Sequence, residues 1–512
     1  MTDKLLFQGA DWDFPTLQRI YDACEEVALG ELGLDVYPNQ IEVITAEQML
    51  DAYSSVGMPL YYKHWSFGKH FAFQEASYRK GLMGLAYEIV INSSPCISYL
   101  MEENTATMQT LVTAHAAFGH NHFFKNNYLF KQWTDADGIL DYLEFAKKYV
   151  THCEHRHGAR AVEQTLDAAH ALMSHGIDRY PGKKKLDLRA EEKRAGRRRL
   201  HEEGSFNDLW RTVPTAPIKS DVLLNVERRQ ALLGLPQENL LYFLEKTAPR
   251  LAPWQRELLR IVRHIAQYFY PQSQTKVMNE GTATYVHYRI MKRLHEQERL
   301  SDGNFLEFLQ SHTNVVYQPD FDNRHFSGFN PYALGFAMMQ DIERIVTNPE
   351  AEDREWFPDI AGTGDVMGVL RGVWKDYRDE SFISQFLSPR LIRHFRMFHL
   401  HDDPEESAGI KVDAIHDERG YRRVRRELSR QYDVGFLDAN IEVIDVDLAG
   451  DRRLMLRHAV LKGAQLNEVD AKRVLQHLAD LWSYDVSLVE VDQSGTTLKE
   501  YVTHPRKLAA AA

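Results

Sequence analysis

Three histidines within eight residues form the densest group of potential metal ligands in the chain: His115, His120 and His122. Side chains seven positions apart in an α-helix lie within about 20° of each other, so His115 and His122 share a face if the segment is helical. His120 lies about 140° away on an unbroken helix. Gly119 weakens the helix at this point, and a local bend could bring His120 to the others. Because imidazole binds zinc, iron and manganese, the spacing predicts a metal site, with buried structural histidines as the alternative.

A second segment of the chain offers a carboxylate from another predicted helix. Glu280 and His287 are seven residues apart, so both point to the same side of that helix. Gly281 and Ala283 leave room beside Glu280 for another helix to approach closely. A glutamate from one helix with two histidines from another is the ligand set of many hydrolytic zinc sites. The alternative is structural, because Asn279 could cap this helix with Glu280 in its first turn.

The two segments together predict one metal site. We expect His115, His120 and Glu280 to bind a divalent cation, with zinc as the first choice. His122 and His287 are expected either to replace one of these ligands or to support them from the surrounding protein.

The sequence also offers candidates for the catalytic base and the substrate contacts of such a site. The HExxH signature places a glutamate beside the first histidine, but the corresponding residue here is Ala116. Glu88 is our candidate base, because an acid inside an apolar segment needs a partner; an ion pair with arginine or lysine would satisfy it equally well. Lys125 follows the histidine cluster and is available to an anionic substrate. His64 and Trp65 could line a pocket, although core packing is the default for Trp65.

A different metal site is suggested by acid and histidine pairs spaced three residues apart. The candidate ligands are Glu154, His157, Glu163, Asp167 and His170. Di-iron helix bundles use glutamates together with ExxH pairs of this spacing. The spacing also arises by chance in a chain with 23 histidines, so a di-iron oxidative enzyme is the third possibility.

Composition limits the classes of protein. The 512 residues include 61 Lys and Arg against 73 Asp and Glu, a net charge of −12 that argues against bulk binding of DNA or RNA. Three cysteines without a CxxC pair argue against a disulfide framework, and no apolar run approaches the roughly 20 residues of a membrane helix. We therefore expect a soluble, cytoplasmic protein without membrane insertion. Serine-hydrolase, nucleotide-hydrolase and Rossmann motifs are absent from the sequence.

The distribution of apolar residues predicts an α+β protein. Helical periodicity dominates residues 1–401, which we expect to form a large, mainly helical domain. Residues 402–410 are polar and predict a linker. Alternating strands and helices then predict a small α+β domain at residues 411–505, including a helix capped by Asn467. The basic segment 183–199 is expected to be a solvated surface, with a phosphate or acidic partner as the alternative.

Several of these motifs, taken in order, resemble the SpoVR family, named after stage V sporulation protein R. They lie at residues 64–69 (HWSFGK), 85–92 (LAYEIVIN), 115–127, 279–285 (NEGTATY) and 330–332 (NPY). The resemblance covers the chain to about residue 505. It implies a role in formation of the spore cortex, a peptidoglycan layer, in spore-forming bacteria. In bacteria that do not sporulate, it implies a stationary-phase or starvation response and a gene near that of a serine protein kinase; the length and acidic charge resemble this second group.

The leading functional hypothesis is a metal-dependent hydrolase that acts on peptide-like or cell-wall-related material in a sporulation or starvation programme. The rival hypothesis is a non-enzymatic signalling or scaffold partner of the kinase system, in which the histidines are only structural. In that case a basic helix of the C-terminal domain could contact the partner through Arg422, Arg423, Arg425 and Arg426. The oligomeric state does not follow from these patterns.

Overall fold

The computed structural model describes residues 4–54, 62–65, 88–179, 233–321, 323–398, 400–402, 410–412, 417–433, 438–448, 450–461 and 464–506. The chain forms two compact units, which are described separately. The first consists of residues 1–148 and 270–433, and the second of residues 149–269 and 434–512.

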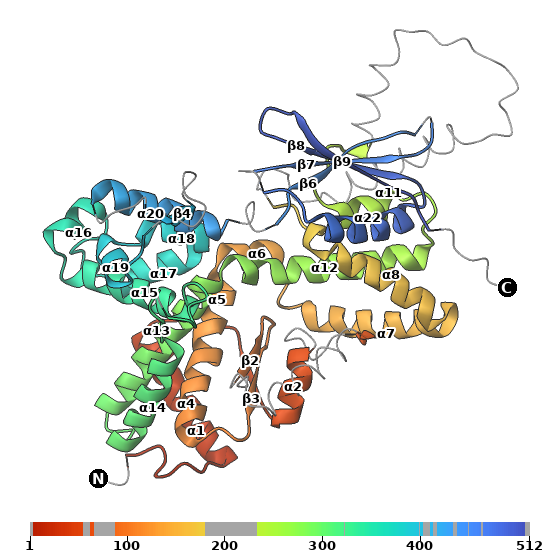
Figure 1. Ribbon diagram of the computed structural model, residues 1–512. Coiled ribbons are helices and arrows are strands. Elements are labelled where there is room, and N and C mark those ends of the chain that lie inside the picture. The colour runs from red at the N-terminus through yellow and green to blue at the C-terminus, as the bar shows by residue number, and fades with distance from the viewer. Residues whose placement is uncertain are drawn as a thin grey trace, which may run out of the picture. The chain divides into compact units, whose positions relative to one another are not determined.

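Helix α13 (Lys276–Glu296) is the centre of the first unit. It packs against α15 (Pro331–Thr347), the π-helix η2 (Ala114–His120), α14 (Asp302–Val315) and α4 (Ala106–Thr113) (Figure 1). Helix α1 (Phe14–Glu25), followed by the π-helix η1 (Glu26–Glu31), packs against α4. The buried residues of these helices form one apolar core, so the predicted helical periodicity reflects burial around α13.

Two glycine contacts bring the central helices unusually close. A Cβ atom on Gly335 would lie 2.2 Å from the carbonyl oxygen of Val277, so α15 crosses α13 in backbone contact. A Cβ atom on Gly119 would lie 2.6 Å from the Cα atom of Ala283, which brings η2 equally close to α13. The prediction that small residues beside Glu280 admit another helix is therefore confirmed.

A small sheet in the first unit was not predicted. Strands β1 (Asn39–Ile44), β2 (Glu88–Ile91) and β3 (Cys96–Met101) have the order β1-β3-β2, with β1 parallel and β2 antiparallel to β3. Every residue of β3 is buried. A strand buried on both faces lacks the alternation that identifies a half-exposed strand, which explains the omission.

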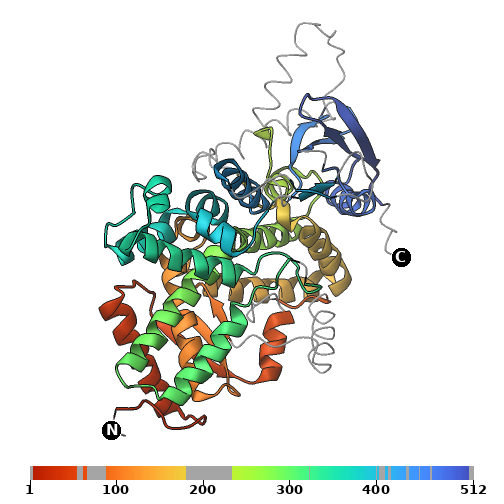
Figure 2. The same cartoon turned by 60° about the vertical axis from the view of Figure 1, so that its left-hand side comes forward.

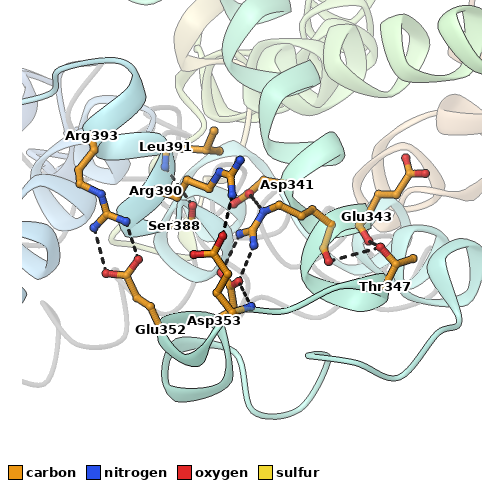
Figure 3. Close-up of polar contacts among 11 residues, drawn as sticks. Asp341, Glu343, Thr347, Glu352, Asp353, Ser388, Arg390, Leu391 and Arg393 are labelled. Atoms are coloured by element: carbon orange, nitrogen blue, oxygen red, sulfur yellow. Dashed lines mark hydrogen bonds and ion pairs between the residues drawn. The ribbon is translucent and has the colours of Figure 1, made fainter.

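The remaining elements of the first unit surround this core. They are α2 (Ala46–Ser54), α5 (Asn121–Asn126), α6 (Tyr128–Trp133), α16 (Ala351–Trp356), α17 (Val366–Asp376), α18 (Asp379–Phe386), α19 (Pro389–His394), α20 (Glu418–Gln431) and the strand pair β4 (Leu400–Asp402) and β5 (Ile410–Val412). Ion pairs connect several of them. Figure 3 shows the Arg393 guanidinium of α19 facing the Glu352 carboxylate of α16, at 2.6 Å. Arg344 of α15 similarly contacts Asp341 and Asp353.

The second unit contains a four-stranded sheet. Strands β6 (Ile441–Val446), β7 (Leu454–Ala459), β8 (Val486–Val491) and β9 (Thr497–Thr503) pair in sequence order, and only the β7–β8 pair is parallel. Helix α22 (Glu468–Trp482) connects β7 to β8 and packs on β8 and β9 (Figures 1 and 2). The Asn467 side chain accepts hydrogen bonds from the backbone of Val469 and Asp470, as predicted for a cap.

Further helices complete the second unit or pass into it. These are α7 (Ile139–His157), α8 (Ala159–Ala171), the short 3₁₀-helix η3 (Met173–His175), α11 (Leu240–Thr247) and α12 (Pro253–Gln274). The predicted α+β fold, mainly helical before a small C-terminal sheet, is confirmed. No helix among the described residues is long and apolar enough to span a membrane.

The compact units differ from the segments expected from the sequence. Residues 149–269 cluster with the C-terminal sheet rather than with the helical core, whereas α20 packs on α18 in the first unit. Residues 403–409 of the expected linker and the basic segment 183–199 lie outside the described residues. The boundaries at 402 and 411 therefore stay predictions.

Candidate metal centre

A π-helical turn brings His115 and His120 to the same side. In the seven-residue helix η2 the backbone bonds close over five residues instead of four. Residues five apart, such as His115 and His120, therefore lie one above the other, and their ring centroids are 4.6 Å apart. The separation of about 140° holds only for an α-helix. The bend expected at Gly119 is thus a π-helix, a form that occurs frequently at functional sites.

Two carboxylates face these imidazoles. The Glu280 Oε2 atom lies 3.7 Å from His115 Nε2 and 3.6 Å from His120 Nε2. From strand β2, Glu88 Oε1 lies 3.8 Å from His115 Nε2. Ligand atoms of Glu88, His115 and His120 all lie within 4.8 Å of one another. Segments far apart in sequence therefore bring Glu88, Glu280 and His120 close to His115.

The donor atoms fit a cation better than they fit one another. Distances of 3.6–3.8 Å are too long for hydrogen bonds. His115 Nε2 and Glu280 Oε2 are both buried without a hydrogen-bond partner in the described part of the chain. Ligands at about 2.0–2.1 Å around a tetrahedral zinc are roughly 3.3 Å apart, close to the distances found here. Buried polar atoms without partners are unfavourable unless something else satisfies them.

Both imidazoles are held through their other ring nitrogen. His120 Nδ1 lies 2.9 Å from Asn279 Oδ1. An amide oxygen only accepts hydrogen bonds, so His120 Nδ1 carries the proton and Nε2 presents a lone pair to the centre. His115 Nδ1 lies 2.9 Å from His287 Nδ1. His287 thus contacts a candidate ligand from the side opposite to Nε2, and its supporting role stays a prediction.

The prediction that Asn279 caps its helix is wrong. Helix α13 begins at Lys276, so Asn279 lies inside it, and the buried carboxylate of Asp379 satisfies its first turn instead. Asp379 accepts hydrogen bonds of 2.8 Å from the backbone N–H groups of both Val277 and Met278. The partner of this helix end comes from α18, about one hundred residues away in the chain. No local sequence signal identifies such a contact.

Burial and neighbouring charges shift the pKa values of Glu88 and Glu280 in opposite directions. Burial raises the pKa of Glu88 above its ordinary value. Burial also acts to raise the pKa of Glu280, but His120 and His115 lower it more, so the net pKa is depressed. Glu280 is therefore the more readily ionised of the two carboxyl groups.

The pKa values of His115 and His120 also shift in opposite directions. Burial lowers the pKa of His120 to about 4. Burial acts in the same direction on His115, but the Glu280 and Glu88 carboxylates outweigh it and leave a raised pKa. Tyr332, at the start of α15, lies nearly parallel to the His115 ring with centroids 6.4 Å apart. It was not among the predicted site residues.

Two predicted site residues have partners elsewhere. His122 Nδ1 accepts a hydrogen bond of 3.0 Å from the backbone N–H of Asp35, and its ring packs edge-on against Trp374. It therefore faces away from the convergent ligand atoms and is not an alternative ligand. Lys125 is paired with the Asp35 carboxylate at 2.5 Å and also donates to the Val36 carbonyl.

The predicted aromatic wall is only partly described, because residues 66–87 lie outside the described chain. The His64 and Trp65 rings lie against each other with centroids 5.6 Å apart, and Trp65 is 52% exposed. The default prediction of core packing for Trp65 is therefore wrong.

The ligand set proposed for a di-iron site is not assembled. Of the described residues, only Glu88, His115 and His120 form a group of three or more His, Cys, Asp or Glu side chains with converging donor atoms. His157 is exposed at the end of α7 and stacks on the Trp254 ring, with centroids 4.6 Å apart. The spacing of Glu154 and His157 thus reflects two positions on one helix face rather than a metal site.

These features define a class of protein: a mainly helical chain with a buried pair of imidazoles facing two carboxylates, and a small mixed sheet near its C-terminus. The chain belongs to the SpoVR family. Residues 11–437 match the SpoVR-like protein model, and residues 439–493 match the SpoVR-like C-terminal domain. The uncharacterized protein YcgB of Escherichia coli (strain K12) is 52% identical over 491 residues, which cover 96% of this chain and 95% of that protein. No solved structure matches the chain.

Proposed function

We propose that this chain is a metal-dependent hydrolase whose cation is held by His115, His120 and Glu280. One observation carries the proposal. The buried atoms His115 Nε2 and Glu280 Oε2 have no hydrogen-bond partner among the described residues, yet they lie 3.7 Å apart with His120 Nε2 beside them. A purely structural cluster would be expected to close these gaps with hydrogen bonds, whereas a bound cation would satisfy all three atoms.

Distances suggest different roles for the two carboxylates. Glu280 Oε2 lies 3.7 and 3.6 Å from the two ring nitrogens, which suits a ligand, whereas Glu88 Oε1 lies 3.8 Å from His115 Nε2 and its ligand atom is within 4.8 Å of that of His120. We therefore assign Glu88 as the catalytic base. A bound divalent ion would supply Lewis acidity and lower the pKa of a coordinated water. Zinc is our first choice because two imidazoles and a carboxylate are common zinc ligands, with iron or manganese as alternatives.

The substrate class follows from the family context. Peptide-like or cell-wall-related material in a sporulation or starvation programme would present amide bonds that such a site could hydrolyse. The exposed Trp65, with His64 behind it, is our candidate for a substrate-contacting wall. Lys125 would contact substrate charge only by exchanging its Asp35 partner. We place the protein in the cytoplasm, which is supported by three buried cysteines that are free of disulfides.

The test is metal content after native purification, with His115→Ala and Glu280→Ala as paired variants. We expect about one equivalent of metal in the wild type and a large loss in both variants. His122→Ala is the matched control, because His122 is as buried as His115 but faces Asp35. A wild type that is free of metal and still active in cells would refute the proposal.

A second candidate is a non-enzymatic partner of a serine protein kinase system, and the surface of α20 favours it. Arg419, Arg422 and Arg426 are exposed on this helix at spacings of three and four residues, so they lie on one face, where Arg422 is paired with Glu418 at 2.9 Å. Arg425, predicted to belong to this contact, instead packs over the Trp356 ring and donates to the Leu387 carbonyl. An acidic surface of the partner is the chemistry that this face fits.

The two candidates predict opposite effects of mutation. If partner binding is the function, Arg419→Glu combined with Arg426→Glu should abolish it, and His115→Ala should not. If chemistry is the function, cells should tolerate the arginine variants and lose function with His115→Ala, provided that the variant remains folded by circular dichroism.

A further inference from the structure

The candidate ligand His115 is the first of three hydrogen-bonded imidazoles. His115 Nδ1 lies 2.9 Å from His287 Nδ1, and His287 Nε2 lies 3.0 Å from His312 Nδ1. The three residues come from η2, α13 and α14. Their side chains are at most 5% exposed, so water does not compete substantially for these bonds.

Each hydrogen bond in this chain has a required direction. A metal ligand needs a lone pair on Nε2, so neutral His115 must carry its proton on Nδ1 and donate to His287 Nδ1. His287 must then carry its own proton on Nε2, where it donates to His312 Nδ1. The two distances fit this arrangement, because each joins one donor to one acceptor.

The competing arrangement places the proton of neutral His115 on Nε2. That proton would point toward the Glu280 and Glu88 carboxylates, which lie at 3.7 and 3.8 Å. That proton would also occupy the position of the proposed cation. Donation from His115 Nδ1 to His287 Nδ1 therefore leaves Nε2 free for a cation.

Aromatic rings hold the far end of the chain in place. The His312 ring lies 5.2 Å from the Tyr288 ring, 5.6 Å from the Phe308 ring and 4.8 Å from the Phe336 ring, between centroids. This packing restricts rotation of His312, so its Nδ1 stays directed at His287. The spacing of the sequence contains no hint of His312, because it lies on a third helix.

We propose that His287 and His312 are positioning residues that keep the proton of His115 on Nδ1 and so leave Nε2 free to bind a cation. The proposal rests on the proposed function, but the position of the proton can be measured without a metal. Partners that hold a ligating histidine typically contribute 10- to 100-fold to metal affinity.

The first experiment measures the proton directly in metal-free protein. Nitrogen-15 spectra of histidine-labelled protein, at a pH where His115 is neutral, should show the Nδ1–H form of His115 in the wild type. His287→Leu should lose this preference, and His287→Asn should keep it, because an amide oxygen can take the place of the accepting Nδ1. An Nε2–H form of His115 in the wild type would overturn the proposal.

The second experiment measures zinc affinity by competition with a chelator, and the absorption spectrum of the cobalt-substituted protein. We expect His287→Leu to bind zinc about 10- to 100-fold more weakly, with a changed cobalt spectrum, and His287→Asn to restore most of the affinity. His312→Leu should cause a smaller loss. His122→Leu and His122→Asn are the matched controls, because His122 is as buried as His115 and its Nδ1 contacts the Asp35 backbone at another place.

The outcomes separate the two proposals. Equal losses in His287→Leu and His122→Leu would show a general effect of packing and overturn the positioning role. If the wild type shows the Nδ1–H form but binds no zinc, iron or manganese, the proposed metal-dependent function fails and the tautomer assignment stands.

Discussion

Gly119 and Ala283 are in backbone contact where the histidine-bearing helix crosses the glutamate-bearing helix. A Cβ atom on Gly119 would lie 2.6 Å from Ala283 Cα and 2.9 Å from Ala283 Cβ. Neither neighbour is a flexible side-chain end, so a larger residue can be accommodated only if the helices move apart. The contact therefore determines the distance between the imidazoles of η2 and the carboxylate of Glu280.

Replacing Gly119 with alanine should accordingly destabilise the protein and weaken metal binding together. Overpacking of a core typically costs about 1–3 kcal/mol, and we expect a loss of this size in urea unfolding. Gly372→Ala is the control, since Gly372 is exposed inside α17 and a Cβ there would meet nothing within 4 Å. This control should gain roughly 0.5–1 kcal/mol. Similar results for the two variants would contradict the close crossing.

Removal of the Asp379 carboxylate should disturb the start of α13 and hence Glu280. Asp379→Ala leaves two buried N–H groups without their acceptor, which should cost about 1–3 kcal/mol for each lost bond. Zinc affinity should fall as well. Asp365→Ala removes an exposed cap from α17, so it should cost only about 1 kcal/mol and leave zinc affinity unchanged. Normal zinc affinity in Asp379→Ala would show that this cap does not affect the candidate metal centre.

Buried neutral histidines outside the candidate metal centre should make the free energy of unfolding depend on pH. Burial, assisted by Arg179, lowers the pKa of His175 to about 3. The imidazole of His175 becomes protonated near pH 6.5 in the unfolded chain, whereas it stays neutral there in the folded chain. Its contribution to stability is therefore fully present above about pH 6.5 and is lost as the pH falls toward 3. Each such group lowers the free energy of unfolding by up to about 1.4 kcal/mol per pH unit in this window.

Urea midpoints measured from about pH 7 to pH 5 test this expectation. His175→Gln removes the titrating group, so its free energy of unfolding should fall less steeply with decreasing pH than that of the wild type. The difference in slope should correspond to about one fewer proton taken up on unfolding. Parallel curves for the two proteins would show that His175 does not remain neutral in the folded state.

Zinc should raise the thermal stability of the wild type. A ligand that binds only the folded state stabilises it by about 2.7 kcal/mol at 100 times its dissociation constant. We expect a concentration-dependent rise in Tm that chelator reverses and that His115→Ala abolishes. His122→Ala should retain the rise, relative to its own metal-free Tm. A shift of equal size in His115→Ala would place the zinc elsewhere.

Local patterns in the sequence were sufficient to predict most secondary structure. Helical periodicity predicted the mainly helical part of the chain, alternation predicted the C-terminal strands, and Asn467 was predicted as a helix cap. Such patterns repeat within a few residues, so a short window contains them. The residue types at the candidate metal centre were also evident, because clustered histidines are conspicuous. The buried strand β3 was missed because it lacks alternation.

Tertiary structure decided how these residues meet. The π turn at His115 and His120, the approach of Glu88 from β2, and the partners of each Nδ1 atom all depend on contacts between segments distant in sequence. The same is true of Asp379 and His312, whose roles come from the helices against which they pack. Sequence spacing specifies the directions in which side chains point from one helix. Whether side chains from several helices and a strand meet depends on how closely the backbones of those elements cross. At Gly119 that approach is set by the absence of a single Cβ atom.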